Sequence, residues 1–188
     1  MTYPVVLCSR AININLKGGI PIRNSTKNMV LCALFASLIA ICAWISVPVF
    51  DIAVTLQTFA VFLTLGLLGG KQGSAAILIY LLLGAAGMPV FSGFRGGIGV
   101  LAGVTGGYLW GFLLSGFVYW ALARFGKLPA MIAGQLVCYL CGSIWFYLYA
   151  GGGLWVIVLR CVVPYLIPDA IKIALSYSLC RRLSRHLS

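Results

Sequence analysis

NMVLCALFASLIAICAWISV, residues 28–47, is a run of twenty residues without a single charged side chain. About twenty apolar residues in a helix cross the hydrocarbon core of a bilayer, because each residue adds about 1.5 Å. The rest of the 188-residue chain has the same character, with 62% apolar and 8% charged residues. Soluble domains carry about 25% charged residues. The chain is therefore predicted to be an integral membrane protein.

Five further apolar segments follow along the chain, at 54–68, 73–87, 105–124, 131–150 and 168–183. Together they predict one domain over 27–188, an all-α integral membrane protein with six transmembrane helices. Residues 1–26 are predicted to form a cytoplasmic N-terminal tail or a surface helix. The apolar stretch 151–164 is predicted to be a re-entrant or surface piece, because Arg160 argues against a span that faces lipid.

The basic residues are distributed unevenly over the connections between these segments. Lys and Arg number 13 against two acids, Asp51 and Asp169. With six spans, ten basic residues fall on one side of the membrane and two on the other. The ten are Arg10, Lys17, Arg23, Lys27, Lys71, Arg124, Lys127, Arg181, Arg182 and Arg185. The positive-inside rule therefore predicts that both termini are cytoplasmic, in a multi-pass protein of the inner (cytoplasmic) cell membrane. Nucleic-acid binding is disfavoured, because the basic residues stand in ones and twos between apolar runs.

The residue types and motifs in the chain exclude several kinds of chemistry. The glycine-rich segment 69–73 lacks the Gly-Lys-Ser/Thr ending of a phosphate-binding loop, so the chain does not supply its own ATPase. One histidine and two acids cannot build a metal centre or a histidine-based triad. The seven cysteines, including the Cys138/Cys141 pair, are interpreted as small side chains that pack between helices. The chain is predicted to be a binding protein, with neither enzymatic activity nor a cofactor.

Asp169 and Lys172 are the first candidate site residues, in the segment 168–172, PDAIK. Pro168 beside an acid predicts a helix start, and a spacing of three places both charges on one face of that helix. Ionisable groups at membrane depth are costly and usually functional. The alternative is a self-neutralising pair that serves packing alone.

The other candidates are polar or aromatic groups near the predicted outer side. Gln57 is a ligand contact or an interhelical hydrogen bond, and Arg95 is a carboxylate partner or an exposed loop charge. Tyr108, Tyr139 and Tyr149 are predicted to line an apolar pocket or to form an interfacial belt. The outer connection 88–104 is long and rich in glycine, but its apolar side chains favour an ordered lid.

Five segments in register resemble BioY, the substrate-binding S component of biotin energy-coupling-factor (ECF) transporters. They are VTLQT at 54–58, LLLGAAGMPVF at 81–91, SGFRGGIGVL at 92–101, TGGYLWG at 105–111 and PYLIPDAIK at 164–172. The resemblance implies the S-component fold, with six helices and a vitamin pocket near the outer surface that is closed by outer loops. It also implies that an ECF transmembrane coupling protein and ATPase subunits are partners.

The resemblance also implies roles for individual residues. Asp169 and Lys172 would bind the ureido ring of biotin, Gln57 would add a polar contact, and Arg95 would pair with the carboxylate. Tyr108, Tyr139 and Tyr149 would flank the apolar ring. Small residues spaced by four on the first helix would contact the coupling subunit; here these are Cys32, Ala36 and Ala40. The alternatives are an S component for a different vitamin and a membrane assembly protein without transport activity.

Overall fold

The computed structural model describes residues 24–49, 52–151, 159 and 162–186, and these residues are mostly helical. In chain order the elements are α2 (Asn24–Trp44), β1 (Ser46–Val49), β2 (Ile52–Thr55), α3 (Gln57–Ala85), α4 (Ile98–Ala102), α5 (Gly106–Leu122), the 3-10 helix η1 (Ala123–Phe125), α6 (Lys127–Ala150) and α8 (Val163–His186). Most of the predicted N-terminal tail and re-entrant piece lie outside the described residues.

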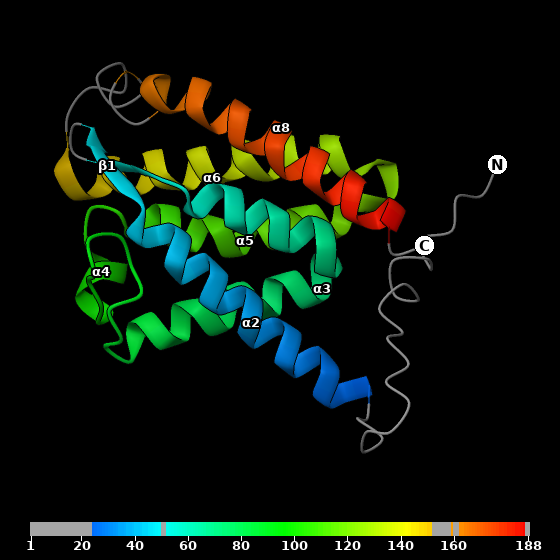
Figure 1. Cartoon of the computed structure of the whole chain (residues 1–188). Coiled ribbons are helices and arrows are strands. Elements are labelled where there is room, and N and C mark those ends of the chain that lie inside the picture. The colour runs from blue at the N-terminus through cyan, green and yellow to red at the C-terminus, as the bar shows by residue number, and fades with distance from the viewer. Residues whose placement is uncertain (1–23, 50–51, 152–158, 160–161, 187–188) are drawn as a thin grey trace.

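The second and third predicted helices are the two arms of α3. The chain leaves helical geometry at Gly69, where φ is 80° and ψ is 170°. Glycine adopts this positive φ without the steric cost that a β-carbon would bring. Figure 1 shows the second arm running back across the molecule from this bend. The turn uses so few residues that the two helices are continuous apart from Gly69.

The short hairpin β1–β2 corrects the expectation of an all-α chain. The two strands pair antiparallel, from Ser46 with Thr55 to Val49 with Ile52. Valine, isoleucine and threonine, which favour extended backbone, dominate this stretch. The predicted second span began at residue 54, but Val54 belongs to β2 and the helix begins at Gln57.

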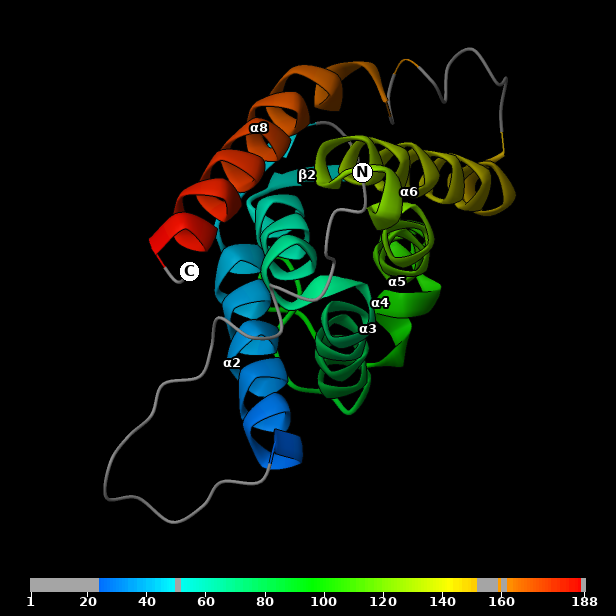
Figure 2. The ribbon, with the colours of Figure 1, turned by 90° about the vertical axis from the view of Figure 1, so that its right-hand side faces the viewer.

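The first arm of α3 lies at the centre of the bundle. Figure 2 shows this arm enclosed by α2, α8, α5, α6 and the second arm of α3. Ala60, Val61, Phe62 and Leu65 on this arm are completely buried. A helix that is apolar on all sides is suited to such a position.

Close contact between α5 and α6 depends on glycine. A β-carbon on Gly107 would overlap the side chain of Trp145, and one on Gly111 would press against Cys138. These two glycines belong to a four-residue repeat that the sequence continues back to Gly99, where the structure has open space. Small residues let helix backbones approach closely. Within this repeat, Gly107 and Gly111 allow such an approach because they face α6, whereas Gly99 does not.

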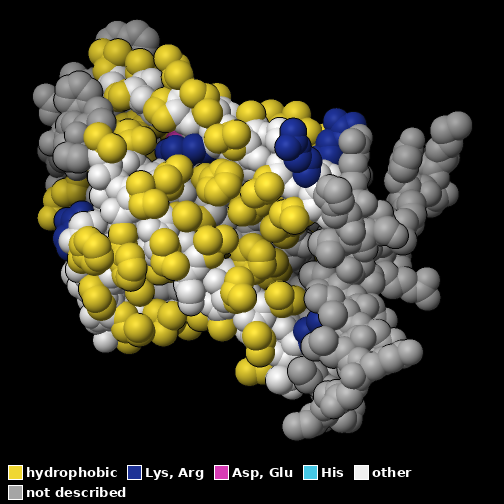
Figure 3. Space-filling model, in the orientation of Figure 1, with side chains coloured by type: hydrophobic (Ala, Val, Ile, Leu, Met, Phe, Trp, Pro, Cys, Tyr) yellow, Lys and Arg dark blue, Asp and Glu magenta, His cyan; other side chains and the backbone are white. Residues whose placement is uncertain are grey.

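The outer surface of the bundle is apolar. Among the residues that the structure describes, four helices are long and apolar enough to cross a membrane: Thr26–Trp44, Gln57–Ala85, Gly106–Phe125 and Lys127–Tyr149. The helix α8 is not among them, and it carries Asp169, Lys172 and several arginines. Hydrophobic side chains spread over the lateral face of the molecule in Figure 3. Large exposed residues such as Leu148 (75%) and Met29 (68%) are expected to face lipid.

Most of the described basic residues lie at one end of this bundle. Lys27 is near the start of α2, Lys71 is just past the bend in α3, Arg124 and Lys127 flank the α5–α6 turn, and the last turns of α8 carry Arg181 and Arg182. Figure 1 places these helix ends together, opposite the hairpin and α4. The distribution expected from six apolar segments is therefore present in the described part of the fold.

Candidate ligand-binding site

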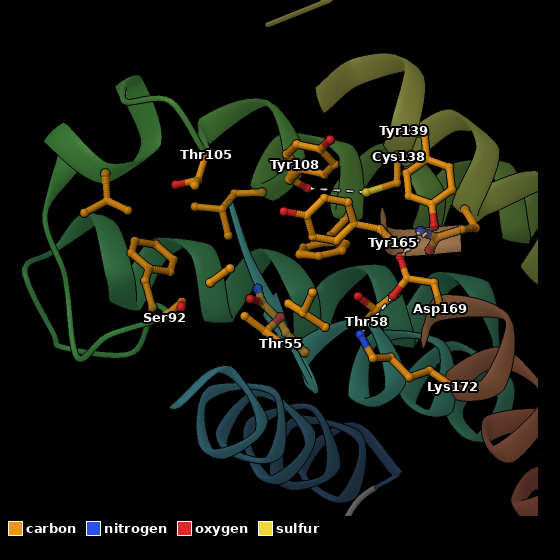
Figure 4. Close-up of a pocket in the computed structure, with 18 of the residues that line it drawn as sticks. Thr55, Thr58, Ser92, Thr105, Tyr108, Cys138, Tyr139, Tyr165, Asp169 and Lys172 are labelled. Carbon is orange, nitrogen blue, oxygen red and sulfur yellow. Dashed lines mark hydrogen bonds and ion pairs between the residues drawn. The ribbon is translucent and has the colours of Figure 1, made fainter. Parts of the chain in front are cut away.

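A cavity of about 250 Å³ lies at the end of the bundle that carries the hairpin. Its walls come from β2, the first arm of α3, the connection before α4, and the helices α4, α5, α6 and α8. Figure 4 shows Ser92 and Thr105 towards one end of this cavity and Asp169 and Lys172 towards the other. The side chains near Asp169 are buried, whereas Arg95 and Ser92 retain access to solvent. The cavity therefore has a buried inner end and an accessible outer end.

Asp169 organises the inner end. Its Oδ1 accepts a hydrogen bond from Lys172 Nζ at 2.9 Å. Its Oδ2 accepts from Gln135 Nε2 at 2.9 Å and from Tyr139 Oη at 2.8 Å. Asp169 is 5% exposed and Lys172 7%. A buried carboxylate is retained only where such partners replace water, and this one is held by side chains from both α6 and α8.

Pro168 was predicted to start the last helix, but it does not. The helix α8 begins at Val163, and Pro168 lies inside it. Pro164 occupies the first turn instead, where the missing backbone N–H of proline costs nothing. Asp169 consequently lies in the second turn, away from the positive end of the helix. The expected face shared by Asp169 and Lys172 is present, and it forms their ion pair.

Gln57 lies inside the cavity wall, in a second buried network. Its Nε2 donates to Tyr80 Oη at 3.0 Å, and Tyr80 in turn donates to the backbone carbonyl of Val90 at 3.3 Å. Tyr80 comes from the second arm of α3, and its ring also packs edge-on against Phe91. The network therefore links both arms of α3 to the loop that borders the cavity.

The outer end is built by the connection between α3 and α4. Arg95 lines the cavity, and its Nε donates to the backbone carbonyl of Ser92 at 3.1 Å. Trp44, at the end of α2, donates to the Pro89 carbonyl at 2.8 Å and stacks on Phe94 with ring centroids 5.0 Å apart. The predicted lid is thus ordered, although Phe94 itself remains 64% exposed.

Most of the predicted contacts meet at this cavity. Asp169, Lys172, Arg95, Gln57, Tyr108 and Tyr139 all line it. Tyr149 does not, because it lies near the end of α6 with its side chain 58% exposed. Gln135 and Tyr165 line the cavity but were missed from sequence. In the sequence, Gln135 could have been noticed as an amide side chain within the otherwise apolar segment 131–150. It belongs to none of the motifs that identified the other candidates.

The three residues predicted to contact a coupling subunit lie on the inward face of α2. Cys32, Ala36 and Ala40 are 6%, 1% and 7% exposed and thus buried within the chain. Cys32 Sγ lies 3.5 Å from the backbone carbonyl of Gln72 on α3. Small side chains permit this close approach of α2 to α3, so they serve packing inside the chain. Sequence spacing alone does not show which face of a helix points outward.

Metal binding finds no support among the residues that the structure describes. No group of three or more His, Cys, Asp or Glu side chains lies close enough there to hold a metal ion. Cys138 and Cys141 are free thiols, and Cys138 packs against Gly111 of α5. The site therefore offers hydrogen bonds, charge and apolar surface, the means by which proteins bind small organic molecules.

Comparison with known proteins identifies relatives of this chain. A probable biotin transporter BioY of Pyrococcus horikoshii is 40% identical over 159 residues, which cover 84% of this chain and 96% of that protein. The biotin transporter BioY of Thermotoga maritima is 48% identical over a shorter stretch of 98 residues, 52% of this chain and 58% of the relative.

A solved structure agrees in fold. The crystal structure of an S-component for biotin from an ECF-type ABC transporter superposes with a TM-score of 0.81 at 23% identity, covering 89% of this chain and 95% of that one. This likeness shows the S-component fold. The family model described as the BioY family matches residues 13–188, and this multi-pass membrane protein therefore belongs to the BioY family.

Proposed function

We propose that the chain is the biotin-binding membrane subunit of a biotin uptake system. The described cavity would capture biotin from the outer face of the inner (cytoplasmic) membrane. The chain would cross that membrane six times, counting both arms of α3 and α8, with both termini in the cytoplasm. The gathering of basic residues at the end opposite the cavity supports this orientation.

The two ends of one cavity carry the proposal. The inner end presents the buried Asp169–Lys172 pair, and the outer end presents Arg95. Biotin has a matching division, with a neutral cyclic urea at one end and a carboxylate at the other. A buried acid and base side by side can accept from urea N–H groups and donate to the urea carbonyl. A guanidinium pairs well with a carboxylate.

The aromatic side chains serve the apolar middle of the ligand. Tyr108 lies between the two ends in Figure 4, and Phe112 and Tyr165 also line the cavity. Tyrosine and phenylalanine rings make favourable contacts with a thioether ring and a hydrocarbon chain. Gln57 contributes from a fixed orientation, since Tyr80 holds its amide nitrogen.

Binding is tested by titrating the chain, purified in detergent, with biotin, riboflavin and thiamine. We expect sub-micromolar affinity for biotin alone. Asp169→Asn and Lys172→Ala should each weaken biotin binding at least about tenfold. Lys71→Ala, which removes an exposed lysine at the other end of the bundle, is the matched control and should bind normally. Tight binding of another vitamin, or unchanged affinity in both site variants, would refute the assignment.

The energy source would be an ECF transmembrane coupling protein with ATPase subunits. The buried face of α2 is unavailable to such a partner, so the exposed face of the same helix is its proposed contact. Ala33 and Ser37 lie on that face, four residues apart and both exposed. Ala33→Trp should therefore abolish biotin uptake by cells and leave detergent binding unchanged, whereas Leu78→Trp, on an exposed position of α3, should affect neither. Normal uptake by Ala33→Trp would rule out this contact.

A further inference from the structure

Gln135 holds a buried polar atom that the fold leaves without a partner. Its side chain lines the inner end of the cavity and is 6% exposed. Within the described residues, its Oε1 accepts no hydrogen bond, whereas its Nε2 donates to Asp169 Oδ2 at 2.9 Å. Nearly all buried carbonyl oxygens in proteins have a donor. A ligand donor that reaches an unpaired carbonyl oxygen in a cavity wall therefore forms a hydrogen bond that stabilises the complex more than one to an oxygen that already has a partner.

The orientation of this amide is fixed by its neighbour. Turning the amide over would place Oε1 against the carboxylate oxygen of Asp169, so two acceptors would face each other. Tyr139 donates to the same Oδ2, and Lys172 holds Oδ1. The carboxylate thus anchors the nitrogen side of Gln135, and the carbonyl side is the free one.

We propose that Gln135 Oε1 accepts a hydrogen bond from an N–H group of the ligand's cyclic urea, so that α6 as well as α8 determines the specificity of the site. This inference rests on the proposed biotin function and adds a specificity-determining residue to it. The urea offers two N–H donors, and the inner end then offers two kinds of acceptor, the carboxylate of Asp169 and the amide carbonyl of Gln135. A ligand lacking one N–H would leave a buried acceptor unpaired, and such a loss discriminates strongly between similar ligands.

The test compares biotin with its two cyclic-carbamate analogues, in each of which a ring oxygen replaces one N–H without adding bulk. Wild-type protein should bind each analogue more weakly than biotin, by about tenfold or more. In Gln135→Met, the preference for biotin over one of the two analogues should fall to near one, because the acceptor that reads that N–H is gone. The preference over the other analogue should persist.

Tyr139→Phe is the matched control. It also removes one hydrogen bond to Asp169 Oδ2, but it leaves the Gln135 carbonyl in place. If Gln135 merely positions Asp169, then Gln135→Met and Tyr139→Phe will weaken the binding of biotin and of both analogues alike. The preference for biotin over each analogue will then persist in both variants, and the inference fails. Gln135→Asn, which withdraws the amide by one methylene, gives a second reading if the methionine variant does not fold. Absence of biotin binding by the wild-type chain would instead overturn the proposed function, and this inference with it.

Discussion

Lys172→Met tests whether the buried ion pair serves the ligand or the fold. The substitution keeps most of the length of the side chain and an apolar stem but removes the ammonium group, which lies 2.9 Å from Asp169 Oδ1. Asp169, at 5% exposure, then keeps only the hydrogen bonds from Gln135 and Tyr139. Removing one partner of a buried pair typically costs about 3–5 kcal/mol, because the other charge stays buried without compensation.

The double variant Asp169→Asn/Lys172→Met separates the two roles. It removes both charges and retains an oxygen that can accept from Tyr139 or Gln135. Replacing a whole buried pair is often close to neutral, so we expect a loss of at most about 1–2 kcal/mol. The double variant should therefore be more stable than Lys172→Met, while its biotin affinity remains at least about tenfold below that of the wild type.

Thermal unfolding in detergent, followed by tryptophan fluorescence, measures the stability, and biotin titration of the same samples measures the affinity. A loss of 3–5 kcal/mol corresponds to a fall in Tm of roughly 6–20 °C for a chain of this size. Two results would refute the reasoning. One is a Lys172→Met variant that is as stable as the double variant. The other is a double variant that binds biotin as tightly as the wild type.

Three further substitutions probe the wall, the packing and the mouth of the cavity. Tyr80→Phe should lower the free energy of unfolding by about 1–3 kcal/mol, because the Gln57 amide and the Val90 carbonyl lose their buried partner. Denaturant titration measures this loss. Tyr147→Phe, at an exposed position, is the control and should change the free energy of unfolding by less than about 0.5 kcal/mol. Gly107→Ala should cost about 1–3 kcal/mol by forcing α5 from α6, whereas Gly99→Ala meets open space, so an equal loss in both would contradict the packing account. Arg95→Ala should weaken biotin binding about tenfold without lowering Tm, and the difference from wild type should shrink as salt is raised; a difference independent of salt would argue against a carboxylate contact.

The helices were largely predictable from the sequence because lipid imposes a simple rule. Backbone groups in a bilayer must be satisfied within the chain, so each long apolar run is expected to be helical. The predicted segments 105–124 and 131–150 match α5 and α6 to within a few residues at each end. The hairpin was missed because its two strands are short, and their pairing depends on contacts between residues up to nine apart.

The candidate site was predictable where a charge is rare. Asp169, Lys172 and Arg95 stood out because so few charged residues occur in the chain outside its basic connections. Tyr149 was expected at the cavity, and Gln135 was overlooked, because tyrosine and glutamine occur both in pockets and on helix surfaces. To distinguish these positions, one must know how α6 is rotated about its axis. The pattern of apolar residues does not define this rotation, because the protein is apolar both inside and on its lipid-facing surface.

By itself, the sequence determined that this chain needs lipid as its solvent, that its basic residues favour one side, and that a few polar residues are available for a ligand. These properties follow from composition and from order along the chain. The tertiary structure alone decided which polar groups meet. It brought Gln135 and Tyr139 of α6 to Asp169 of α8, and it turned Cys32, Ala36 and Ala40 inward. The physical reason is that close packing fixes how each helix is rotated, and in a bundle apolar on both sides this depends on the shapes of all its neighbours together.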